Sequence, residues 1–205
     1  YGFLFQGAQY EGLICAWIEL LHNYGGTIFG ESRDNPAGGE VGQRKSQLDS
    51  EEAVKATEFL YDLIYTYKVS PPGTVTYTEG EVRKFYEAGG AAMAREWHDM
   101  AAEFNNPEVS EVAGKVGVVQ IPAGPAGSRT CLGGWVFAIN KFTQHPEEAW
   151  TALKFLTNVD SLKMAFLTDG IPPGRPDVFS EPEIKAHPIW GEVAPTLIKA
   201  VDTGI

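Results

Sequence analysis

The residues best suited to contact a small molecule lie in segment 131–135, which reads Cys-Leu-Gly-Gly-Trp. Gly133 and Gly134 carry no Cβ atom, so the backbone there can approach a ligand closely. The indole of Trp135 offers a flat apolar face and one N–H donor. The apolar run 135–140 predicts a buried strand, which would hold this ring on a rigid element. The alternative is that the glycines mark a bulge and that the ring belongs to the core.

Two further aromatic residues, Tyr10 and Trp97, occupy positions where α/β proteins place ligand contacts. Tyr10 starts a predicted helix and Trp97 ends a predicted strand, and each is flanked by glycine or polar residues rather than by an apolar stripe. Aromatic faces pack against the C–H faces of a pyranose, while the tyrosine hydroxyl, the indole N–H and Asp99 can hydrogen-bond its hydroxyl groups. Charged partners such as Asp99 and Arg175 strengthen bonds of this kind.

Catalytic signatures are missing from the sequence, which contains no GxSxG elbow and no HExxH motif. Segment 39–46 is glycine-containing, but Arg44 stands where a phosphate-binding loop requires its second glycine. We therefore predict no catalytic residue, no metal site and no cofactor. One enzymatic alternative stays open, because Glu96 and Asp99 flank Trp97 as the carboxylates of a glycoside hydrolase would. The competing interpretation is that both carboxylates are solvated or bonded to neighbours.

Composition restricts the class of protein. The chain has 205 residues, 43% of them hydrophobic and 21% charged, which is typical of a folded domain. A net charge of -11 argues against a nucleic-acid or anionic-membrane partner. Cys15 and Cys131 are the two cysteines, and either a single disulfide bond or two buried thiols would fit. Because the sequence opens at Tyr1 inside a predicted strand and ends abruptly, we expect a piece of a longer protein.

The elements that position these residues alternate between strands and helices, which predicts an α/β fold. Strands are expected at 1–5, 91–96, 116–121 and 135–140. Helices are expected at 9–23, from the capping pair Asp49 and Glu52 to Tyr67, from the capping pair Thr78 and Glu81 to Tyr86, and at 146–156, 161–167 and 189–201. Trp17, Trp150 and Trp190 lie in apolar helical stripes and are assigned to the core.

Five segments, in register over nearly the whole chain, resemble the sugar-binding family of ABC-transporter extracellular solute-binding proteins, most closely the maltose/trehalose type. They are Phe5–Leu13, Ser50–Leu60, Phe85–Met93 with Trp97, Gly133–Asn140 with Pro146–Ala149, and Gly170–Arg175. The resemblance implies that Tyr10 and Trp97 stack on or bond the sugar, and that Gly134 and Trp135 form a ligand-contacting pair. Arg175 matches a position near the cleft. At position 99 some relatives carry another polar or aromatic residue in place of Asp99.

The resemblance also implies a periplasmic-binding-protein-like fold of type II, in which two α/β lobes close on the ligand. Residues 1–122 would form the main part of the C-terminal lobe, and residues 123–170 would cross toward the N-terminal lobe. Residues 171–205 would return to the C-terminal lobe. The proline- and glycine-rich stretches 122–128 and 171–176 mark the two crossings. The chain would then carry half of a binding site.

The function implied by the resemblance is non-enzymatic: an oligosaccharide such as maltose or trehalose is held in the interlobe cleft and delivered to an ABC permease. The expected location is periplasmic or extracellular, with a lipoprotein anchor left open and the targeting segment outside this chain. Pairing of two copies, as a homodimer or by element swapping, is also left open. The same fold could instead serve another solute such as a polyamine, for which Glu11, Glu96 and Asp99 would supply negative charge.

Overall fold

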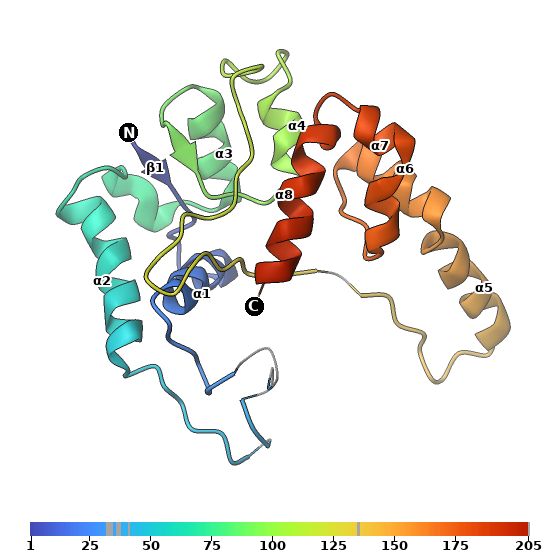
Figure 1. Ribbon diagram of the computed structural model, residues 1–205, viewed down its shortest axis with the longest axis horizontal. Helices are drawn as coiled ribbons and strands as arrows, with labels where there is room; N and C mark the ends of the chain where they lie inside the picture. Colours follow the sequence, from blue (N-terminus) through green and yellow to red (C-terminus); the bar gives the residue numbers. More distant parts are fainter. Residues whose placement is uncertain (32–34, 36–37, 41, 135, 205) are drawn as a thin grey trace.

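The computed structural model describes residues 1–31, 35, 38–40, 42–134 and 136–204. Helices surround a short parallel sheet in this part of the chain (Figure 1). The elements are β1 (Phe3–Leu4), α1 (Glu11–Asn23), α2 (Glu51–Tyr65), α3 (Glu79–Glu87), β2 (Met93–Ala94), α4 (Met100–Phe104), α5 (Pro146–Leu156), α6 (Val159–Asp169), α7 (Pro182–Ala186) and α8 (Trp190–Thr203). Short 3₁₀ helices span Pro72–Thr76 and Pro176–Ser180.

The sheet consists of β1 and β2, which run parallel with Phe3 opposite Met93 and Leu4 opposite Ala94. The Arg95 N–H donates to the Leu4 carbonyl at 2.8 Å, so the pairing continues one residue past β2. The strands predicted at 1–5 and 91–96 are therefore confirmed, although both are shorter than expected. Because the strands are parallel, their carboxyl ends meet at one edge of the sheet.

Local capping chemistry sets the helix ends. The capping box predicted from Thr78 and Glu81 is confirmed: the Thr78 N–H and hydroxyl both donate to Glu81 Oε2, at 2.9 and 2.6 Å. Gly170 ends α6 in the left-handed conformation, with φ of 68°. The capping residue predicted for α2 was wrong by one position. The side chain of Ser50, rather than that of Asp49, accepts a hydrogen bond from the Ala53 N–H, at 3.2 Å.

Clusters of buried apolar residues support the fold, and two of them contain or border tryptophans assigned to the core. One lies among α6, α7, α8 and the second 3₁₀ helix, where Trp190 is 1% exposed and its ring centroid lies 4.9 Å from that of Phe166. The other packs Phe5 against α1 and α2. Trp17 borders this second core, as predicted. The core assignment of Trp150 was wrong, since this ring on α5 is 49% exposed.

Two predicted strands do not form. The segment 116–121 and the described residues 136–140 are extended but belong to no strand. Val136 is 90% exposed, and Figure 1 shows the chain running from there to α5 at the edge of the molecule. The apolar pattern indicates that a segment tends to be buried. A strand also needs a neighbouring strand that forms hydrogen bonds with its backbone N–H and C=O groups. Among the described residues, neither segment has such a neighbour.

Candidate ligand-binding site

The carboxyl ends of β1 and β2 carry the polar and aromatic residues Gln6, Arg95, Glu96 and Trp97. Gln6 is fully buried, and its Nε2 atom donates to the Arg95 carbonyl at 3.1 Å and to Glu96 Oε1 at 2.9 Å. This side chain therefore fixes the two strand ends relative to each other. The edge beyond the carboxyl ends of parallel strands is where α/β proteins bind ligands.

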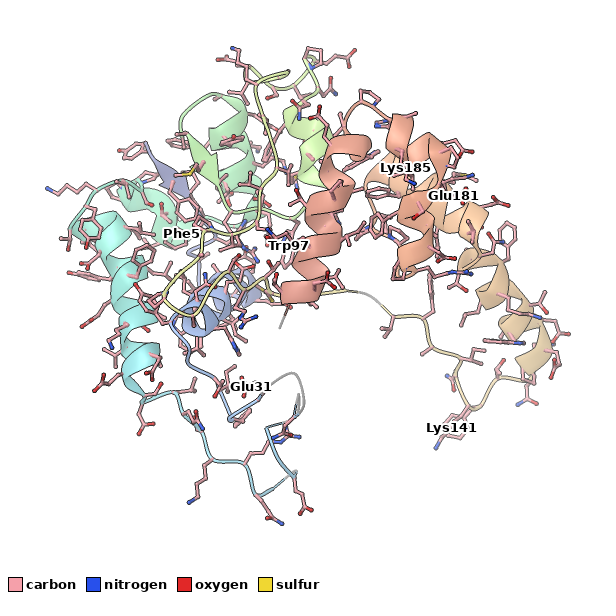
Figure 2. The ribbon with its side chains drawn as sticks, viewed as in Figure 1. Phe5, Glu31, Trp97, Lys141, Glu181 and Lys185 are labelled. Atoms are coloured by element: carbon pink, nitrogen blue, oxygen red, sulfur yellow. The ribbon has the colours of Figure 1, made fainter. Side chains whose placement is uncertain are left out.

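Trp97 is held on several sides near the middle of the molecule (Figure 2). Its Nε1 atom donates to Glu79 Oε1 at 3.2 Å, and its backbone N–H donates to Glu96 Oε2 at 3.1 Å. The guanidinium of Arg95 stands over the ring, 4.5 Å from the centroid. Gly133 lies beside the six-membered part of the indole, because a Cβ there would be 3.8 Å from the ring carbons Cη2 and Cζ3. The ring is thus partly exposed but fixed in orientation.

Arg95 is a buried support for the ring, with 4% of its side chain exposed. Glu19 of α1 accepts from its Nε at 3.1 Å and from its Nη2 at 3.2 Å, and Gln6 Oε1 accepts from its Nη1 at 3.3 Å. Glu19 Oε1 also accepts the Cys131 N–H at 3.1 Å. One carboxylate therefore neutralises Arg95 and anchors the segment that leads to Gly133.

Tyr10 comes directly before α1, and its ring folds back over Gly12, where any side chain would overlap the hydroxyl group. The hydroxyl is shielded from solvent and faces the Glu79 carboxylate, without a well-aligned hydrogen bond among the described residues. Burial and the Glu79 carboxylate raise the pKa of Tyr10, so its hydroxyl stays protonated and can donate. Tyr10, Glu79 and Trp97 therefore form one cluster.

The two carboxyl groups of the cluster differ in charge. Burial alone would raise the pKa of Glu79, but interactions with the Tyr10 hydroxyl, its own backbone and the Trp97 indole lower it below its ordinary value. Burial raises the pKa of Glu96 to about 7, and the Glu79 carboxylate adds to this rise against the opposing Trp97 backbone bond. At neutral pH Glu79 is an acceptor, and Glu96 is close to half protonated.

Among the described residues, no hydrogen bond or ion pair joins the other site residues predicted from the sequence to this cluster. Asp99 precedes α4, and its Cα atom lies against Gly170. Gly134 is exposed, and nothing in the described structure lies within 4 Å of where its Cβ would be. Arg175 is exposed and paired with Asp177 at 2.7 Å. Trp135 falls outside the described residues.

Glu79 was missed at the sequence level. It is the first residue of α3 and follows the helix cap Thr78, so the local pattern there indicated only a helix start. The one signal that could have found it is its place in the first turn, where an acidic side chain is favoured by the helix dipole. Such a residue is normally interpreted as structural.

A parallel strand pair with aromatic and carboxylate side chains at its carboxyl edge is an arrangement that α/β proteins use to bind ligands. The sequence profile of the bacterial extracellular solute-binding proteins matches residues 5–162. The chain therefore belongs to this family, and its fold is that of a lobe of the type II periplasmic-binding proteins. Among the described residues, none of the helices combines the length and apolar character needed to cross a membrane.

Relatives of known name agree with this assignment. The "Probable ABC transporter-binding protein" of Deinococcus radiodurans is 32% identical over 202 residues, which are 98% of this chain and 45% of the relative. Maltose-bound MalE3 of T. maritima is 36% identical with a TM-score of 0.85, over 100% of this chain and 49% of that one. A solute-binding protein of Agrobacterium radiobacter K84 in complex with ribitol is 26% identical with a TM-score of 0.78, over 100% and 48%. The chain spans about half the length of these relatives.

Proposed function

We propose that this chain supplies one side of a sugar-binding cleft in the solute-binding protein of an ABC importer. The observation that carries the proposal is the meeting of Tyr10, Glu79, Glu96, Trp97 and Gly133 at the carboxyl edge of the sheet. The maltose and ribitol complexes of related proteins support a sugar or polyol as the ligand. The ligand is bound and released chemically unchanged.

The chemistry of the cluster suits a neutral polyhydroxy ligand. The Trp97 ring can pack against sugar C–H groups, and the carboxylate of Glu79 can accept bonds from hydroxyl groups. The charge of Arg95 is already neutralised by Glu19, so this arginine is not a free cation for a phosphate or a carboxylate ligand. We place Gly134, Trp135, Asp99 and Arg175 at the margin of the same cleft, as the family resemblance implies.

Binding would involve a second lobe. In a two-lobed protein, a ligand that contacts both lobes binds the closed state more tightly and so shifts the population toward closure. The closed form would then dock on the permease subunits at the outer face of the membrane. A periplasmic or extracellular location follows from this role and agrees with the family to which the chain belongs.

Nuclear magnetic resonance tests the site directly, because each of the five tryptophans contributes one indole N–H signal. The signal lost in Trp97→Phe identifies Trp97, and the one lost in Trp150→Phe identifies an exposed ring outside the cluster. Adding maltose, ribitol or D-tagatose at tens of millimolar should move the Trp97 signal and leave the Trp150 signal in place. If no sugar moves the Trp97 signal, the proposed site is wrong.

A polyamine is the second candidate ligand, favoured by the two carboxyl groups of Glu79 and Glu96 beside an arginine that is already paired. Spermidine added in the same experiment separates the two proposals. Movement of the Trp97 signal with spermidine but not with any sugar would favour the polyamine. The half-protonated state of Glu96 reduces the negative charge at neutral pH, which is why we place the sugar first.

A further inference from the structure

The two cysteines approach each other although they are distant in sequence. Cys15 is a buried residue of α1, and Glu19 lies one turn later on the same face of that helix. The Cys131 N–H donates to Glu19 Oε1 at 3.1 Å, which places Cys131 beside that face. The Cys131 thiol interacts electrostatically with the Cys15 thiol, and both thiols act on the Arg95 guanidinium, so the three groups are neighbours.

The reduced thiol of Cys131 is unreactive in the folded chain. Burial, and next the neighbouring Cys15 thiol, raise the pKa of Cys131 to about 12. The reactive thiolate is then on the order of 10⁻⁵ of the Cys131 population at pH 7. Exchange in the native state is therefore slow, and oxidation is fastest while the chain folds and both thiols are still solvated.

We propose that Cys15 and Cys131 form an intramolecular disulfide bond when the chain folds in an oxidising compartment. The extracellular assignment of the family supplies the compartment, and oxidising conditions allow such bonds to persist. The oxidant is a disulfide compound. One cysteine thiolate attacks it and releases the first thiol, and the second cysteine attacks the mixed disulfide and releases the second. The two protons lost by the protein appear on the two released thiols.

The cross-link would act on the ligand site as well as on stability. It ties segment 131–134, which brings Gly133 to the Trp97 ring, onto the helix that begins next to Tyr10. The bond closes a loop of about 115 residues, and long loops gain the most from closure because the unfolded chain loses the most freedom. We expect the thermal unfolding midpoint to rise by about 10 °C on oxidation.

Thiol counting tests this inference without any sugar, so its outcome is independent of the proposed function. The chain is secreted or refolded at pH 8 with oxidised and reduced glutathione, then unfolded in guanidinium with iodoacetamide and weighed. The expected result is no alkylated cysteine and a non-reduced peptide that joins Cys15 to Cys131. Two alkylated cysteines, a glutathione adduct or a disulfide between two chains would each overturn the proposal.

The matched control is Cys15→Ser/Cys131→Ser. Its unfolding midpoint should be the same in oxidising and reducing buffer, whereas that of the wild-type chain should differ by about 10 °C. If the variant does not fold, peptide mapping of the wild-type chain still decides the question.

Discussion

The buried carboxyl group of Glu96 should make the stability of the chain depend on pH. Burial raises its pKa from the ordinary 4.5 to about 7, so the folded chain keeps a proton that the unfolded chain releases. The stabilisation is fully present below pH 4.5 and is lost as the pH rises through about 7. A shift of this size corresponds to about 3 kcal/mol in the free energy of unfolding, at 1.36 kcal/mol per pKa unit.

The substitution Glu96→Gln removes this titration and keeps a neutral side chain of the same shape, which imitates the protonated form. Urea unfolding of both proteins between pH 4.5 and pH 8 gives the free-energy difference at each pH. We expect the variant to gain about 3 kcal/mol relative to wild type across this range. The matched control is Glu58→Gln, at an exposed position of α2, which should leave the pH profile unchanged. Parallel profiles for wild type and Glu96→Gln would refute the reasoning.

Three further predictions concern the parts that hold the site. Glu19→Ala leaves the buried Arg95 without its partner and should cost about 3–5 kcal/mol in urea unfolding; a cost under 1 kcal/mol would contradict the buried pair. Gly170→Ala adds a side chain at φ of 68°, with its Cβ 2.6 Å from Trp190 Cη2, and should lower the unfolding free energy by at least about 1–2 kcal/mol; an unchanged midpoint would mean that α6 ends differently. Trp190→Ala should cost about 3–5 kcal/mol, and Trp150→Ala, measured alongside, should cost much less.

The sequence predicts well where the cause is local. The capping box at Thr78 follows from side-chain preferences within a few residues and is confirmed. The end of α6 at Gly170 has an equally local cause, because glycine adopts the left-handed conformation easily. The strands predicted at 116–121 and 135–140 were wrong over the described residues, which leave out 135, because a strand depends on a neighbour that the local pattern does not reveal. The assignment of Trp150 to the core was wrong for a similar reason. An apolar stripe shows that a helix has an apolar face, but it does not show which element covers that face.

The residues of the candidate site likewise divide into those that the local sequence indicates and those that only the tertiary fold brings together. Tyr10 and Trp97 stood out because they lie beside glycine and polar residues at the ends of elements, and the structure places both against Glu79. Arg95 and Glu19 are 76 positions apart, so their pairing depends on the tertiary fold and not on the local sequence. The roles of Trp135, Asp99 and Arg175 stay predictions.

Calorimetric titration of the chain with maltose tests the central claim most directly, comparing wild type with Trp97→Ala and with the control Trp150→Ala. Loss of one stacking face and its buried area should weaken binding about tenfold in Trp97→Ala and leave the control at the wild-type affinity. Equal affinities for wild type and Trp97→Ala would contradict the claim that a sugar rests on this ring.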